Sequence, residues 1–327
     1  MNATEEFAPG EGIELRLNGV FERLLERCQP HAPVGCAVVH PCDADSLLGA
    51  LEAARFGLIE PVLVGPPARV LATAAECHVD ISRYRLVASA HSHASAAKAA
   101  ELAAVGEVEC LMKGSLHTDE IMGAVVASAS GLRTERRVSH VFVLDVPAYE
   151  RMLMITDAAV NIAPDLKAKR DITQNVIDLA HVLGIAEPRV AILAAIETVN
   201  PDMQSTLDAA ALCKMADRGQ ISGGILDGPL AFDNAINVHA AATKSIESPV
   251  AGRADILVVP DIESGNMLAK QLMYFAGADS AGIVLGARVP VILTSRADSV
   301  RMRIGSAAVA KLVALSRRPP VALQGRE

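Results

Sequence analysis

A hydroxyl, a guanidinium and a carboxylate stand within four residues near the end of the chain, in the stretch VPVILTSRADSVRMRIGSAA. Ser295, Arg296 and Asp298 follow an apolar run that is typical of a strand, and a helix is predicted after them. An arginine can hold a phosphate through paired hydrogen bonds, a hydroxyl can donate to a developing oxyanion, and a carboxylate can accept a proton. Asp298 or Ser299 could instead simply cap the helix, so the role of Asp298 is open at this point.

A second cluster of polar groups follows the apolar run VECLM. Lys113, Gly114 and Ser115 are succeeded by His117 and Thr118, and then by a predicted helix. Glycine lets the backbone approach an anion closely, lysine adds a positive charge, and a helix start offers free N–H groups. This cluster therefore indicates an anion site, although His117 could equally be an acid or base or a side chain bonded within its turn.

Other polar residues stand at or near the ends of predicted strands. In open α/β sheets ligands bind beyond the carboxyl ends of strands, so these residues are further candidates for the substrate pocket. They are Asn161, Asp227, Gly265, Asn266 and Arg288.

The elements that must position these groups alternate regularly. Continuous apolar runs, typical of buried strands, are separated by Ala-rich helical segments, which predicts mostly parallel sheet covered by helices on both faces. VSHVFVLDVP and RMLMITDAAV are instead spaced like an antiparallel pair and mark a change of domain. We predict two α/β domains, one formed by residues 1–140 plus 289–327 and the other by residues 141–288, with the active site in the cleft between them.

Composition excludes several classes of protein. The 327 residues carry a net charge of −8 and only 3% aromatic side chains, which argues against a nucleic-acid partner. The six cysteines form no C-x-x-C pair, the first residues are acidic rather than signal-like, and no apolar run approaches about 18 residues. We expect a cytoplasmic protein without a membrane partner. Recognisable metal-ligand, dinucleotide and nucleophile-elbow spacings are absent, so no metal or bound cofactor is expected.

Five stretches in the same order resemble the phosphate acetyltransferase and phosphate butyryltransferase family. They are LMKGSLHTDEIMGAV, DAAVNIAPDLKAK, DGPLAFDNA, PDIESGNMLAKQL and AGIVLGARVPVILTSRADS. The resemblance covers the chain from about Val34 to its end. Any one stretch would be a weak signal, whereas five in order are a strong one.

The resemblance implies a fold of the isocitrate/isopropylmalate dehydrogenase type, a homodimer, and transfer of an acetyl or butyryl group between coenzyme A and phosphate. Coenzyme A is then a substrate. Ser295 and Arg296 match the family's catalytic Ser-Arg pair. The acetyl branch has an acid seven residues beyond that serine, where this chain has Met302. Asp298 is the nearest carboxylate and is the expected base for the thiol. The thiolate is expected to attack the acyl phosphate directly in a ternary complex, with no covalent enzyme intermediate.

Two other functions are compatible with the same sequence. A catalytically impaired acyl-CoA-binding relative would explain the missing acid at Met302. A metal- and NAD-dependent dehydrogenase of the related fold would need clustered aspartates around a divalent ion. The sequence leaves the acyl chain length open, because acetyl and butyryl groups differ by only two methylenes, worth about 1–3 kcal/mol of discrimination.

Overall fold

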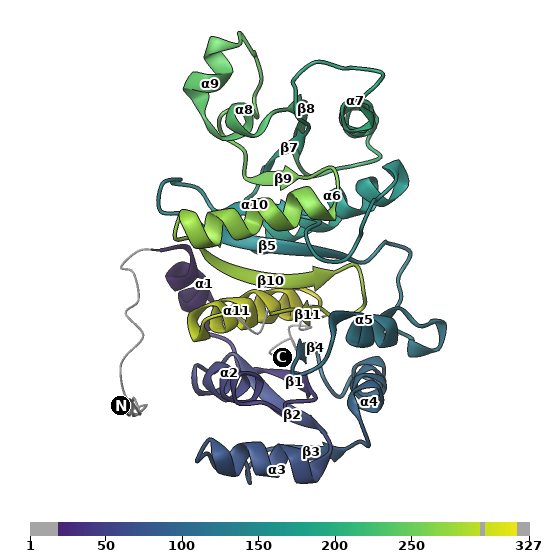
Figure 1. Cartoon of the computed structure of the whole chain (residues 1–327), viewed down its shortest axis with the longest axis vertical. Helices are drawn as coiled ribbons and strands as arrows, with labels where there is room; N and C mark the ends of the chain where they lie inside the picture. The colour runs from purple at the N-terminus through teal and green to yellow at the C-terminus, as the bar shows by residue number, and fades with distance from the viewer. Residues whose placement is uncertain (1–18, 295–297, 319–327) are drawn as a thin grey trace, which may run out of the picture.

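A single sheet runs the length of the molecule in the computed structural model, which describes residues 19–294 and 298–318 (Figure 1). The apolar runs of the sequence form its strands, and most neighbouring pairs are parallel. In spatial order the strands are β3 (Arg85–Ala88), β2 (Ile59–Gly65), β1 (Val34–Val39), β4 (Cys110–Lys113), β11 (Val291–Ile292), β10 (Asp279–Leu285), β5 (Ser139–Asp145), β6 (Leu153–Thr156), β9 (Ile256–Val258), β7 (Arg189–Leu193) and β8 (Ile225–Leu230).

Strand direction reverses in the middle of this sheet. β10 is antiparallel to both β11 and β5, and β5 is antiparallel to β6, which confirms the antiparallel pair expected around residues 138–156. The carboxyl ends of β4 and β11 therefore point one way along the strand direction. Those of β6, β9, β7 and β8 point the opposite way. The two groups of strands meet at β10 and β5.

Helices cover both faces. Since successive side chains of a strand point to opposite faces, the buried clusters assign each helix to one of them. One face, called here the back face, carries α1 (Val20–Cys28), α2 (Ala44–Arg55), α3 (Pro67–Glu76), α6 (Leu166–Val182), α7 (Gln204–Asp217) and α11 (Val300–Ser316). The other, the front face, carries α4 (Ser92–Ala104), α5 (Thr118–Val126), the 3₁₀ turn η1 (Ser128–Ser130), α8 (Phe232–Ile236), α9 (Val238–Thr243) and α10 (Ile262–Phe275).

The apolar core differs between the two faces. On the back face one continuous cluster reaches from Val34 in β1 to Ile256 in β9, and α11 is part of it. On the front face the buried side chains divide into two clusters, one under α4 and α5 and the other under α8, α9 and α10. The gap between these two clusters lies over β5 and β10, and it is there that the polar candidates converge.

Local sequence explains where the helices begin. Asp43, Asp165 and Asp261 each accept a hydrogen bond from a backbone N–H in the first turn of α2, α6 and α10, as expected for N-cap residues. The stretch DNAINVHAAATKSI forms two short helices, because the Asn237 side chain starts a new helix by accepting from His239 N and Ala240 N.

Candidate active site

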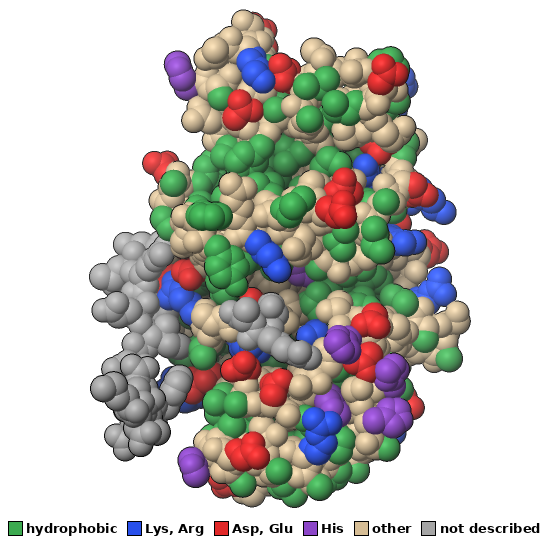
Figure 2. Space-filling model, viewed as in Figure 1, with side chains coloured by type: hydrophobic (Ala, Val, Ile, Leu, Met, Phe, Trp, Pro, Cys, Tyr) green, Lys and Arg blue, Asp and Glu red, His purple; other side chains and the backbone are tan. Residues whose placement is uncertain are grey.

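A cleft of about 490 Å³ lies on the front face between α5 and α10. Figure 2 shows the face of the molecule on which α10 and α5 border it. Its walls come from the loop after β4, from α10 and from the start of α11, and its floor comes from β5. The lining residues are Lys113, Leu116, His117, Thr118, His140, Phe142, Ala159, Asn266, Lys270, Met273, Tyr274, Leu293, Thr294, Asp298, Ser299 and Met302.

The loop after β4 is held tightly against the end of β1. Gly114 has no room for a side chain, because a Cβ there would come within 2.4 Å of the Val39 carbonyl oxygen. The Ser115 N–H donates to the His40 carbonyl at 2.9 Å, and the Ser115 hydroxyl hydrogen-bonds to Asp43. Gly114 and Ser115 thus fix the loop, and Lys113, which is only 8% exposed, is the member of that trio that lines the cleft.

His117 and Thr118 begin α5 at the mouth of the cleft. The backbone N–H of His117 donates to Glu120 Oε2 at 2.7 Å, which caps the helix and leaves the imidazole exposed. Glu120 also accepts from Ser92 Oγ at 2.5 Å and contacts His93 Nδ1 at 2.8 Å. These contacts, the Ser92 hydrogen bond foremost, hold the pKa of Glu120 below its usual value. The glutamate therefore ties the first turns of α4 and α5 together beside the cleft.

The start of α11 settles which residue caps it. Ser299 Oγ accepts a hydrogen bond from Met302 N at 3.3 Å, so the cap is Ser299 and the interpretation of Asp298 as the N-cap is wrong. Asp298 lines the cleft, and its carbonyl accepts from Arg303 Nε at 3.3 Å. Ser295 and Arg296 lie outside the described residues. Thr294 and Asp298, which flank that segment, both line the cleft, so the chain enters and leaves the segment at this site.

The candidates from α10 are divided. Asn266 lines the cleft and donates from Nδ2 to the Ala158 carbonyl at 3.1 Å. Gly265 is buried, and a Cβ on it would come within 2.7 Å of Val259 Cγ2 and 3.0 Å of the Asp157 carbonyl oxygen. The glycine therefore allows α10 to pack against the turn after β6, rather than contacting the cleft.

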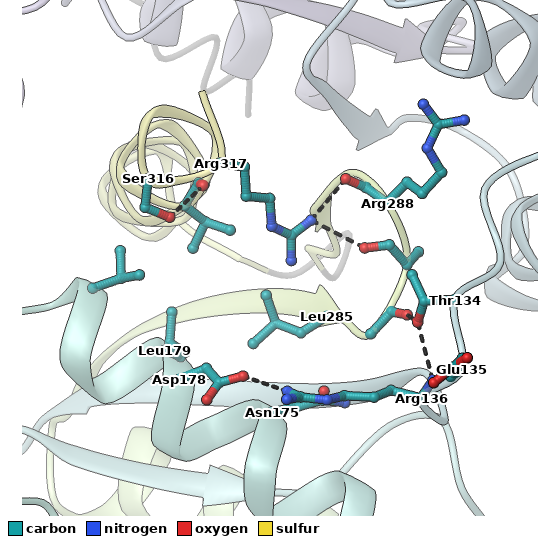
Figure 3. Close-up of a pocket in the computed structure, with 14 residues that line it drawn as sticks. Thr134, Glu135, Arg136, Asn175, Asp178, Leu179, Leu285, Arg288, Ser316 and Arg317 are labelled. Carbon is teal, nitrogen blue, oxygen red and sulfur yellow. Dashed lines mark hydrogen bonds and ion pairs between the residues drawn. The ribbon is translucent and has the colours of Figure 1, made fainter. Parts of the chain in front are cut away.

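Three further candidates lie away from the cleft. Asn161 is buried in a network in which its Nδ2 donates to Val138 O (2.8 Å) and Asp157 Oδ2 (2.6 Å). Asp227 stands on the edge strand β8, separated from β5 by three strands. Arg288 precedes β11 and borders a different cavity of about 620 Å³. Its guanidinium donates to Gly131 O. Figure 3 shows that second cavity, in which Arg317 donates to the carbonyls of Ala287 and Arg288.

The cleft also contains a titratable residue that the sequence reasoning missed. His140 is the second residue of β5 and is 1% exposed, and its Nδ1 has no hydrogen-bond partner in the described part of the chain. Burial lowers the pKa of this imidazole to about 4, and the charge of Asp157 opposes that change only in part. The available signal was a histidine two residues before Phe142 in an apolar strand, which places both rings on one face.

Metal ligands do not cluster in the described ranges: no group of three or more His, Cys, Asp or Glu side chains there is placed to hold an ion. Nor does any helix between residues 19 and 318, as far as the structure describes them, have the length and apolarity needed to cross a bilayer. The six cysteines are free thiols.

The cleft brings together a positive charge, a hydroxyl, an amide and a carboxylate, from Lys113, Thr118, Asn266 and Asp298. Such a set of groups suits an enzyme that binds an anionic substrate and transfers a group from it. The model of the family described as "Phosphate acetyl/butaryl transferase" matches residues 87–311, more than half of the chain. The chain belongs to this phosphate acetyl/butyryl transferase family, which confirms the resemblance found in the sequence. It is accordingly a phosphate acyltransferase, and the impaired relative and the dehydrogenase are not needed to explain it.

Individual relatives support the same family assignment. A phosphate acetyltransferase of Rhizobium meliloti is 61% identical over 298 residues, covering 91% of this chain and 94% of that protein. A phosphate butyryltransferase of Clostridium acetobutylicum is 41% identical over 294 residues, covering 90% and 98%. The crystal structure of a branched-chain phosphotransacylase from Enterococcus faecalis superposes with a TM-score of 0.75 at 29% identity, over 86% of this chain and 99% of that one.

The fold prediction is also confirmed. Besides the phosphotransacylase, a putative 4-hydroxythreonine-4-phosphate dehydrogenase from Salmonella typhimurium matches with a TM-score of 0.55 over 88% of this chain and 100% of that one. Its 13% identity shows likeness of fold alone. The dehydrogenase-like α/β architecture expected from the sequence is therefore present.

Proposed function

We propose that the cleft between α5 and α10 is where an acetyl or butyryl group passes between coenzyme A and phosphate. The observation that supports this most is convergence: Lys113 and Thr118, Asn266, and Asp298 come from three separate segments of the chain and line one cleft. The chain on both sides of Ser295 and Arg296 borders the same cleft. A lysine and a helix N-terminus on one wall suit the phosphate of an acyl phosphate, and an arginine at position 296 would add paired hydrogen bonds to it.

The proposed reaction is direct attack in a ternary complex. The thiol of coenzyme A gives its proton to Asp298, and its sulfur forms a bond to the acyl carbon as the bond from that carbon to the phosphate oxygen breaks. The departing phosphate then takes the proton from Asp298, so that the enzyme is unchanged. Arg296 and Lys113 neutralise the phosphate, Ser295 donates to the oxyanion or orients the thiol, and no bound cofactor takes part.

The supporting residues have assigned places in this proposal. His117 and Thr118 complete the phosphate end of the cleft, with Gly114 and Ser115 fixing their loop. Asn266 contacts the substrate, and Gly265 sets the position of α10. Asn161, Asp227 and Arg288 have no contact with the cleft, so we assign them supporting roles in the fold around it.

Replacement of Ser295 or Arg296 by alanine tests the site. We expect kcat for phosphate-dependent release of coenzyme A from butyryl-CoA to fall by about 10² or more in each variant. Arg218→Ala, at the exposed end of α7, is the matched control and should keep wild-type activity. Full activity of Arg296→Ala would contradict the phosphate role, and a pH–rate profile of Asp298→Asn identical to wild type would contradict the base.

We also propose that the working enzyme is a cytoplasmic homodimer of two-domain subunits, with residues 1–140 plus 289–327 in one domain and 141–288 in the other. The division of the front-face core supports the domain boundary. Met267 and Phe275 of α10 are 65% and 89% exposed, which is unusual apolar exposure outside the cleft and supports burial by a second copy. A monomeric mass for wild type in light scattering would contradict the dimer. Neither nucleic acid nor a membrane is proposed as a partner.

The preferred length of the acyl chain can be determined by comparing substrates directly. The relatives include proteins named for acetyl, butyryl and branched-chain transfer. Measuring kcat/KM for acyl phosphates of two to five carbons would identify the preferred length, and a maximum beyond butyryl would contradict the proposed substrate range.

A further inference from the structure

His140 is the most deeply buried titratable side chain on the floor of the cleft. It projects from the start of β5 on the same face as Phe142, and the two rings meet edge to face with centroids 4.4 Å apart. The backbone of His140 is also anchored, since Thr156 Oγ1 donates to the His140 carbonyl at 2.7 Å. The imidazole is thus fixed within the site, although none of the roles assigned above uses it.

A glycine on the neighbouring strand makes room for this ring. Gly282 of β10 stands opposite Phe142, and a Cβ there would lie 2.3 Å from the Leu293 carbonyl oxygen and 3.2 Å from His140 Nε2. The imidazole therefore extends across Gly282 toward the chain that leads from β11 to Ser295. Its Nε2 is the ring nitrogen directed at that part of the cleft.

The surroundings also determine where the imidazole carries its proton. Burial keeps the pKa near 4, so the ring is neutral at pH 7 and has one N–H. The nearby Asp157 carboxylate is occupied by the N–H groups of Ala159 and Val160, each at 3.0 Å, and by Asn161. Nδ1 is buried with no partner among the residues described. Because a buried N–H without an acceptor is the rarer and costlier arrangement, the proton belongs on Nε2.

We propose that His140 is a further catalytic residue, which donates a hydrogen bond from Nε2–H to the acyl carbonyl oxygen and stabilises the oxyanion that develops there. This rests on the proposed function of the cleft. An uncharged donor in a site that excludes water is effective for this purpose, since it need not reorganise as charge appears on the oxygen.

The balance of the reaction assigns His140 the role of donor rather than base. The Nε2 atom directed at the cleft already carries the single proton of the neutral ring, so it can donate a hydrogen bond but cannot accept the thiol proton. The thiol proton therefore goes to Asp298 and on to phosphate, while the sulfur–carbon bond forms and the carbon–oxygen bond breaks. His140 keeps its own proton throughout, and only the length of its hydrogen bond changes.

Three variants and one spectroscopic measurement test this role. His140→Phe keeps a ring without an N–H, His140→Gln restores a donor, and His239→Asn on the exposed surface of α9 is the matched control. We expect kcat/KM to fall by about 10² in His140→Phe, to recover about tenfold in His140→Gln, and to stay at the wild-type value in the control. Carbonyl-labelled butyryl-CoA bound to wild type should show a lowered carbonyl stretching frequency, and His140→Phe should abolish that shift.

Two results would overturn the role. One is wild-type kcat/KM in a His140→Phe protein that melts as wild type does, and the other is a carbonyl frequency in wild type equal to that of butyryl-CoA in water. The second measurement needs no variant, so it decides the matter even where His140→Phe fails to fold. A wild-type chain with the shifted carbonyl but without phosphate-dependent turnover would support the hydrogen bond while contradicting the proposed function.

Discussion

Arg303 donates a hydrogen bond from Nε to the backbone carbonyl of Asp298 at 3.3 Å, from a side chain that is 8% exposed. Its guanidinium also acts on Asp43 at the start of α2. Burial would raise the pKa of Asp43, but hydrogen bonds from Ser46 and Ser115 and the charge of Arg303 bring it below its usual value. Because Ser115 lies in the loop of Lys113, a partly buried polar network joins the two walls of the cleft.

Crowding Arg303 should weaken catalysis without removing any group that contacts substrate. A Cβ on Gly49 of α2 would come within 2.6 Å of Arg303 Cδ. We predict that Gly49→Ala lowers kcat by about tenfold, since a small misplacement of catalytic groups is costly. Gly123→Ala in α5, where a Cβ would meet nothing within 4 Å, is the control and should leave kcat unchanged. Equal activity of both variants in a coupled assay would show that Asp298 does not depend on Arg303.

Met302 should limit the length of the acyl chain. It lies in the first turn of α11 and lines the cleft where the acetyl branch has an acid. We predict that Met302→Ala raises the ratio of kcat/KM for five-carbon over two-carbon acyl phosphates by about tenfold, because the vacated volume accepts added methylenes. Leu71→Ala, on the exposed side of α3, is the control. An unchanged ratio in Met302→Ala would place the acyl chain elsewhere.

His140 should make the stability of the fold depend on pH. Its pKa is lowered from an unfolded value of 6.5 to about 4 by burial, so below pH 6.5 the unfolded chain binds a proton that the native chain refuses. The stability that the neutral ring confers is present above pH 6.5 and is lost as the pH falls through 4, by about 3 kcal/mol in all. Urea denaturation at several pH values should show this decline, and His140→Phe should lack it. An identical decline in both proteins would refute the assignment.

A buried ion pair between α6 and α7 provides a test of stability away from the cleft. Lys169 Nζ lies 2.6 Å from Asp208 Oδ2, and both side chains are 7% exposed. We predict that Lys169→Met costs about 3–5 kcal/mol by leaving the Asp208 charge unpaired, and that adding Asp208→Leu recovers much of the loss. Lys214→Met, in a pair that is over 60% exposed on both sides, should change stability by less than about 1 kcal/mol. Similar losses in both lysine variants would contradict this account.

The sequence was informative wherever a local pattern determines local structure. Apolar runs predicted the strands, and the polar cluster at Lys113 was placed correctly at the cleft because one strand end and one helix start fix it. The resemblance to the family located the segment before α11. The order of the strands in the sheet was not predictable from local patterns. β10 and β11 come late in the chain, yet they lie in the sheet between β4 and β5.

That order explains which candidates came together. Asn161 and Asp227 were chosen because they belong to strand ends, but the rule assumes that the strands point the same way. β6 and β8 run opposite to β4. Asp227 also lies on a strand that three others separate from β5, and the amide of Asn161 is bonded to Val138 O and Asp157 and does not line the cleft. His140 was missed for the converse reason: it lies within a strand rather than beyond its carboxyl end, and only the gap between the front-face clusters turns that position into a floor.

The back face has a thermodynamic consequence. Its cluster includes side chains of β1, β9, α6 and α11, so both halves of the sheet share the same buried surface. Neither half could lose its fold without exposing apolar groups of the other. We therefore expect heat to melt the subunit in a single cooperative transition, with equal calorimetric and van't Hoff enthalpies, even though a cleft divides the opposite face. The enzyme would thus bind its substrate between two walls but unfold as one cooperative unit.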